Sequence, residues 1–185
     1  IRSTLATPSD SVSRLPPDRT PRPPAPDSST GCDVVRILIA NRGEIARRVI
    51  RTARALGHTT IAVYADPDAT APFVAEADVA FRLGPADLAA SYLSPERLLT
   101  AIAETRADAV HPGYGFLSEN AAFARAVVDA GCRWIGPRPE AIEMMGSKIE
   151  ARRLAASAGV PIIPGFDESQ DPFDLAAAAD RIGYP

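Results

Sequence analysis

The sequence predicts an α/β protein with a doubly wound parallel sheet, and three observations support this prediction. Short β-branched apolar segments alternate with longer segments whose apolar residues recur at helical spacing. The short segments are nearly continuous in apolar residues, as expected for strands that helices cover on both faces. Glycines, prolines and capping residues mark the ends of the segments. A chain of strand and helix units of this kind favours right-handed crossovers within one parallel sheet.

The first strand and helix are predicted over residues 34–40 (VVRILIA) and 41–57. In the second of these segments apolar residues recur every three or four positions, and Gly57 follows them where a left-handed residue would end a helix. Residues 59–65 (TTIAVYA) and 79–83 (VAFRL) indicate the second and third strands. These elements form the first half of the predicted sheet.

The second half of the sheet begins with a helix whose start is marked by Ser94 as N-cap and Pro95 as first helical residue. Residues 107–112 (ADAVHP) indicate a fourth strand that ends at Pro112. A helix that Gly131 ends comes next, and a short strand, RWIG, follows it.

Composition divides the chain into three expected parts. Residues 1–32 hold seven of the 18 prolines among Ser, Thr, Asp and Arg, so we expect this extension to be disordered. A targeting peptide is an alternative for the extension, but its aspartates and the lack of an apolar segment argue against one. Residues 33–146 are expected to form the first domain, and residues 147–185 the beginning of a second, truncated one.

After the sheet we expect three helices, over residues 141–146, 147–159 and about 172–182. Ser147 and Glu150 have the spacing of a capping box, in which each side chain accepts from the other residue's backbone N–H group.

Charge and hydropathy exclude several function classes. The formal net charge of −3 argues against a nucleic-acid partner, because such modules usually carry a basic surplus. No apolar segment approaches the roughly 18 residues of a membrane-spanning helix. Cys32 and Cys132 match neither a metal-ligand spacing nor a disulfide framework. We therefore expect a soluble, cytoplasmic protein with no membrane or nucleic-acid partner.

The turn after the first strand, residues 41–44 (NRGE), lies where open parallel sheets usually bind ligands. It has one glycine where a dinucleotide-binding turn has three, which weakens an oxidoreductase hypothesis. Asp66, after the second strand, lies where a ribose-binding acid could be. The favoured interpretation is a tight turn that places Glu44 near the positive end of the helix.

Residues 111–120 (HPGYGFLSEN) are more informative, because two glycines flank Tyr114 after a buried strand. Glycines there would let a ligand approach the main chain, and the next helix, with Ser118 as candidate N-cap, would offer free N–H groups. His111 by itself is typical of a structural histidine. The candidate site residues in this segment are Tyr114, Gly115 and Glu119.

Lys148 is the only lysine among 20 basic residues. It follows the expected N-cap of its helix, where a cation opposes the helix dipole, so helix propensity does not explain it. Its ammonium and the free amides there would suit a phosphate or another polar nucleotide group. An ordinary surface lysine is the alternative.

Five segments together resemble the biotin carboxylase component of biotin-dependent carboxylases. They are ILIANRGEIARRVIRTARALG, HPGYGFLSENAAFA, WIGP, AIEMMGSKIEARRLAASAGVPIIPG and RIGYP, in this order from about residue 34 to residue 185. The resemblance implies a Rossmann-like domain that leads into an ATP-grasp domain. It also implies a reaction in which MgATP and bicarbonate carboxylate biotin on a carrier protein, for an acyl-CoA, pyruvate or related carboxylase. The implied partners are a biotin carboxyl carrier, a carboxyltransferase and a second copy of the chain.

The resemblance also implies residue roles. Lys148 is similar to the family's ATP-contacting lysine, Tyr114 and Gly115 match the turn that faces the biotin and bicarbonate side of the cleft, and Glu119 lies close by. Arg48 and Arg51 resemble positions at the homodimer interface. Catalytic residues and Mg²⁺ ligands are expected beyond Pro185, so we expect a fragment that is inactive alone. An oxidoreductase domain and a non-catalytic regulatory or assembly module remain as alternatives.

Overall fold

The computed structural model describes residues 12–13, 33–166 and 168–184. The described strands form one sheet in the order β1-β4-β3-β2-β5-β6. Strands β4, β3, β2, β5 and β6 run parallel to one another, and β1 pairs with β4 antiparallel. The predicted α/β fold with a parallel sheet is therefore confirmed. The strands are β1 (Val12–Ser13), β2 (Arg36–Ile39), β3 (Thr59–Ala65), β4 (Val79–Gly84), β5 (Ala109–His111) and β6 (Arg133–Trp134).

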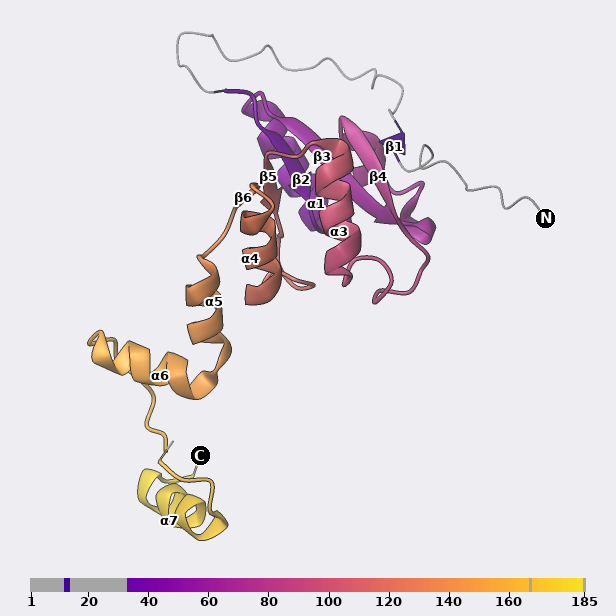
Figure 1. The fold of residues 1–185 in the computed structure, drawn as a ribbon. Helices are drawn as coiled ribbons and strands as arrows, with labels where there is room; N and C mark the ends of the chain where they lie inside the picture. Colours follow the sequence, from indigo (N-terminus) through magenta and orange to yellow (C-terminus); the bar gives the residue numbers. More distant parts are fainter. Residues whose placement is uncertain (1–11, 14–32, 167, 185) are drawn as a thin grey trace, which may run out of the picture. The chain divides into compact units, whose positions relative to one another are not determined.

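Helices cover both faces of the sheet, as a doubly wound fold requires. Ile50 of α1 and Phe73 of α2 are buried against one face, in a cluster with Ile39 of β2. Leu98 of α3 and Phe123 of α4 are buried against the other face. Figure 1 shows α3 and α4 in front of the sheet and α1 behind it. The helices are α1 (Gly43–Ala55), α2 (Pro72–Glu76), α3 (Pro95–Thr105) and α4 (Ala121–Asp129).

Capping residues explain where two of these helices begin. The Ser94 hydroxyl accepts a hydrogen bond from the Arg97 N–H group at 3.3 Å, as predicted for the N-cap of α3. The prediction of Ser118 as N-cap of α4 is wrong. The N-cap is Asn120, whose Oδ1 accepts from the Phe123 N–H group at 2.9 Å. Both residue types can cap a helix, and α4 begins two residues later than Ser118 would require.

Helix α2 and the short 3₁₀ helix η1 (Asp66–Asp68) were not predicted from the sequence. With five and three residues, neither is long enough to show a helical period. Both lie between β3 and β4, and η1 places two carboxylates directly after β3. Strands β2, β3, β4, β5 and β6 agree with the predicted ones to within a few residues at their ends, whereas β1 has no predicted counterpart.

Most of the N-terminal extension lies outside the described residues, so its predicted disorder stays a prediction. The structure describes only Val12–Ser13 within it, as the short strand β1 beside β4.

The chain divides into two compact units, Ile1–Pro139 and Glu140–Pro185. The second unit contains α5 (Pro139–Gly146), apart from its first residue Pro139. It also contains α6 (Lys148–Ser157) and α7 (Pro172–Ile182). Among its described residues only Ile142 and Ala178 are buried. The domain limits expected from the sequence, at residues 32 and 146, stay predictions.

The predicted capping box at the start of α6 is half formed. The Ser147 hydroxyl accepts from the Glu150 N–H group at 3.3 Å, as the pattern requires. The Glu150 carboxylate pairs with Arg153 at 3.2 Å.

Candidate functional site

The candidate site lies where the strand order changes direction, between β2 and β5. From β2 the chain first builds the sheet outward through β3 and β4, and then on the other side through β5 and β6. Ligands of open parallel sheets bind at the carboxyl ends of the strands at such a switch point. A cavity of about 330 Å³ lies there. Its lining residues are Asn41, Arg42, Gly43, Glu44, Ile45, Tyr114, Gly115 and Phe116.

The cavity joins two segments that the sequence analysis treated separately. One wall is the turn from β2 into α1, residues 41–45, and the other is formed by residues 114–116 after β5. Tyr114 and Gly115 line the cavity, whereas Glu119 is exposed and does not line it. The structure therefore groups the NRGE turn with the glycine-containing segment.

Asn41 holds the two walls together, and the sequence analysis missed it. Its side chain is buried, and its amide donates to the carbonyl oxygens of Pro112 and Tyr114, both at 2.8 Å. Its Oδ1 atom accepts from the Arg42 N–H group at 2.9 Å. The only signal in the sequence is a polar residue directly after an apolar strand.

Gly113 and Gly115 both have left-handed backbones, with φ of +68° and +66°. A Cβ atom on Gly113 would lie 2.7 Å from Nδ2 of Asn41, so this glycine makes room for the asparagine and not for a ligand. Around the corresponding position on Gly115 nothing lies within 4 Å. Of these two glycines, Gly115 is therefore the one that leaves its main chain open to the cavity.

Tyr114 projects outward beside Gly115 and is 60% exposed. Its hydroxyl donates a hydrogen bond to the carboxylate of Glu44, which lies in the first turn of α1. This hydrogen bond raises the pKa of the Tyr114 hydroxyl, because it favours the protonated form. A neutral phenol and a carboxylate therefore stand at the mouth of the cavity.

The His111 side chain has a structural role, as the sequence analysis favoured. Its Nδ1 atom accepts from the Gly113 N–H group at 3.0 Å, and burial lowers its pKa. The histidine therefore supports the segment that leads to Tyr114.

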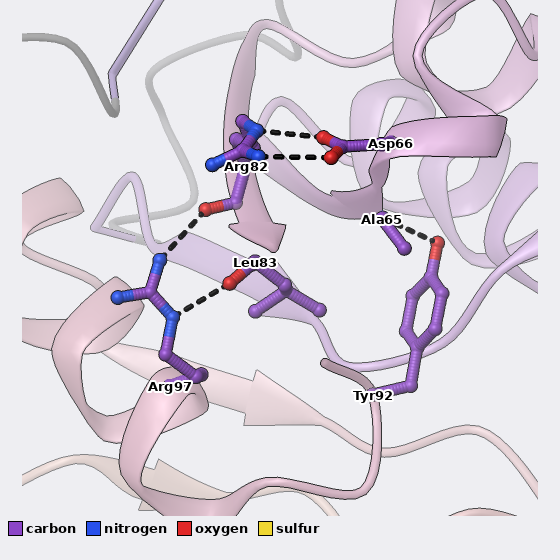
Figure 2. Close-up of polar contacts among 6 residues, drawn as sticks. All are labelled: Ala65, Asp66, Arg82, Leu83, Tyr92 and Arg97. Atoms are coloured by element: carbon purple, nitrogen blue, oxygen red, sulfur yellow. Dashed lines mark hydrogen bonds and ion pairs between the residues drawn. The ribbon is translucent and has the colours of Figure 1, made fainter. Parts of the chain in front are cut away.

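The Asp66 carboxylate forms an ion pair with Arg82 and is therefore not free to bind a ribose. Its carboxylate receives two hydrogen bonds from Arg82, at 2.6 and 2.8 Å, which hold the pKa of the carboxyl below its usual value. Figure 2 shows this pair next to Arg97, which donates to the carbonyl oxygen of Leu83. The geometry does not favour a dinucleotide site at the end of β3.

The other predicted site residues lie outside the cavity. Arg48 and Arg51 are exposed on α1, and Arg48 also lines a mainly apolar hollow of about 380 Å³ along that helix. Lys148 is exposed as the first residue of α6, in the second unit. It therefore lies in the first turn of α6, where the Ser147 hydroxyl already accepts from the Glu150 N–H group. Its role in nucleotide binding stays a prediction.

The described part of the chain lacks both a metal-binding cluster and a membrane-spanning helix. There, no three His, Cys, Asp or Glu side chains gather closely enough to hold a metal ion. In the same residues no helix has the length and hydropathy to cross a membrane.

Comparison with known proteins identifies the family. Residues 33–142 match the family described as "Biotin carboxylase, N-terminal domain". The chain belongs to this family. This biotin carboxylase N-terminal domain contains both walls of the cavity, and the oxidoreductase alternative is not favoured.

Individual relatives agree with the family match. The chain is 50% identical over 153 residues to the biotin-dependent acyl-coenzyme A carboxylase alpha3 subunit of Mycobacterium leprae, covering 82% of the chain and 26% of the relative. It is 47% identical over 151 residues to biotin carboxylase 2 of Bacillus subtilis, covering 81% and 34%. A solved dimer of the biotin carboxylase domain of Hydrogenobacter thermophilus 2-oxoglutarate carboxylase, with MgADP, ADP and bicarbonate, has a TM-score of 0.75 at 44% identity, covering 81% and 33%. The chain thus spans about a third or less of each relative.

Proposed function

We propose that this chain is the N-terminal part of an ATP-dependent biotin carboxylase and forms one wall of its active-site cleft. In the proposed reaction MgATP and bicarbonate carboxylate biotin that is attached to a carrier protein. The observation that carries the proposal is the cavity at the switch point, which lies within the residues that match the family. The proposed partners are the biotin carboxyl carrier and a carboxyltransferase.

The cavity offers chemistry that suits the biotin side of such a cleft. Tyr114 presents a largely exposed ring whose hydroxyl is held by Glu44, and next to it the main chain of Gly115 is open. A flat ring system with a polar edge could lie against the tyrosine and bond to the open main chain. We therefore propose that Tyr114 and Gly115 face biotin and bicarbonate, with Glu119 close by.

For the nucleotide, this chain contributes Lys148 at the start of α6. The ammonium and the free N–H groups of the first helical turn would hold a phosphate or another polar group of ATP. MgATP, when bound, supplies the phosphoryl group that activates bicarbonate. The described residues contain no metal-binding cluster, so we assign no Mg²⁺ ligand to them.

A chimera tests the nucleotide role. Residues 33–185 would replace the matching region of Bacillus subtilis biotin carboxylase 2, to which they are 47% identical. In this chimera Lys148→Ala should raise the KM for ATP on the order of tenfold while kcat changes little, because a binding contact is lost. Bicarbonate-dependent ATP hydrolysis is the measurement. Arg153→Ala, on the same helix, is the control, and an unchanged KM in the Lys148 variant would refute the assignment.

We also propose that the protein forms a homodimer through the face of α1 that carries Arg48 and Arg51. The two arginines are three positions apart, so they lie on one face of the helix, and both are exposed. Sedimentation velocity of the chimera should show a dimer. Replacement of both arginines by glutamate should shift it towards monomer, and an unshifted dimer would contradict this interface.

A further inference from the structure

A buried carboxylate lies behind the cavity. Asp68, the last residue of η1, is only 8% exposed and does not line the cavity. Arg42 donates to its Oδ1 at 2.6 Å, and the Tyr92 hydroxyl donates to its Oδ2 at 2.7 Å. Burial of a carboxylate is unfavourable unless its oxygens are hydrogen-bonded, so each partner stabilises one oxygen of Asp68.

Tyr92 connects Asp68 to Phe116. It is 2% exposed, and its hydroxyl also accepts from the Ala65 N–H group at 3.2 Å (Figure 2). Burial raises the pKa of Tyr92, so the hydroxyl keeps its proton and remains a donor to Asp68. The tyrosine ring is stacked on Phe116, with ring centroids 5.2 Å apart and planes at 9°.

The two residues held in this way belong to opposite walls of the cavity. Arg42 comes from the turn between β2 and α1, and Phe116 comes from the segment after β5. The Arg42 guanidinium also lies over the Tyr92 ring, 5.6 Å from its centroid. Phe116 has a φ of +45°, a conformation that residues with a Cβ atom avoid, so its neighbours must hold it.

We propose that Asp68 is a positioning residue of the cavity. Without touching a ligand, it fixes one wall directly through Arg42 and the other through Tyr92 and Phe116. It thereby sets the place of Tyr114 and Gly115, which precede Phe116. Its importance for biotin rests on the proposed function, whereas the order that it imposes on the two walls does not.

Asp66 provides a matched control for this role. It lies two residues earlier on η1, and its carboxylate also binds an arginine at 2.6 Å. Its partner Arg82 does not line the cavity. Substitution of Asp66 therefore removes an aspartate–arginine pair on the same short helix, one that is more exposed than the pair of Asp68, and we expect it to leave both walls undisturbed.

Hydrogen exchange in the 185-residue chain tests the order of the walls. Asp68→Asn keeps the shape of the side chain but removes its charge. Amide exchange over residues 41–46 and 113–118 should rise on the order of tenfold, while residues 50–55 of α1 keep their protection. Asp66→Asn should leave both wall segments unchanged. Unchanged walls in Asp68→Asn, or an equal rise throughout the unit, would overturn the proposal.

Tyr92→Phe is the second variant, and it tests the positioning role of Asp68 if Asp68→Asn fails to fold. It keeps the ring stack on Phe116 but removes the hydroxyl that binds Asp68. Exchange should rise at residues 113–118 and stay unchanged at residues 41–46, because Arg42 keeps its own bond to Asp68. An equal rise of amide exchange in both segments would contradict the proposal that Asp68 holds one wall through Arg42 and the other through Tyr92.

In the chimera, Asp68→Asn should raise the KM for biotin on the order of tenfold and leave the KM for ATP unchanged. A merely structural role would lower the active fraction and leave both KM values as they were, which would contradict positioning. If the unsubstituted chimera folds but shows no activity, the proposed function fails, and the exchange experiment still decides the role of Asp68.

Discussion

At the scale of single residues, two glycines share one backbone conformation but differ in their surroundings. Gly113 and Gly115 both have φ near +67°, yet only Gly113 lies against a side chain, that of Asn41. The Asn41 amide donates to main-chain oxygens on both sides of Gly113. The close approach at Gly113 is therefore part of how the two walls of the cavity are joined.

This difference predicts unequal effects of the same substitution. Gly115→Ala should lower the free energy of unfolding by about 1–2 kcal/mol, because alanine disfavours a left-handed backbone. Gly113→Ala should lower it by about 2–5 kcal/mol, because displacement of Asn41 also breaks buried hydrogen bonds. Urea unfolding of the two variants measures the difference, and equal losses would show that the contact with Asn41 contributes nothing.

At the scale of elements, most helices and strands could be predicted because their signals are local. β3 and α7 have the predicted limits, and α3 has the predicted capping residues. α2 could not be predicted because five residues are too few for a helical period. The prediction of Ser118 as the cap of α4 was wrong because Asn120, two residues later, is also a residue type that caps helices.

The cap of α4 gives a prediction at this scale. Asn120→Ala should lower the free energy of unfolding by about 1 kcal/mol, because the Phe123 N–H group loses its acceptor. Ser118→Ala is the matched control and should change it by less than about 0.5 kcal/mol. Thermal unfolding of both variants measures these losses. A larger loss in Ser118→Ala than in Asn120→Ala would show that Ser118 is the cap.

The candidate site was predictable only in part, for a reason that also belongs to this scale. Tyr114 and Gly115 could be selected because glycines flank an aromatic residue in a short segment. Asn41 could not, because its partners lie more than 70 positions away and only the pairing of β2 with β5 brings them near. Asp68 is similar, since Tyr92 and Arg42 reach it from two other segments.

At the scale of the whole molecule, the two units differ in how completely they bury their apolar residues. The first has clusters on both faces of its sheet. In the second, Ile163 and Phe173 are 84% and 85% exposed, and two described residues are buried. The chain also spans only 26% and 34% of the length of two carboxylases that it matches. We therefore predict that the 185-residue chain alone does not carboxylate biotin.

Residues 33–185 should form part of a working biotin carboxylase once the rest of such an enzyme is supplied. The formation of labelled carboxybiotin from labelled bicarbonate, biotin and MgATP by the chimera with Bacillus subtilis biotin carboxylase 2 tests this. The chimera should form ATP-dependent carboxybiotin, and the 185-residue chain alone should form none. A chimera that folds and dimerises but forms no carboxybiotin would contradict the claim.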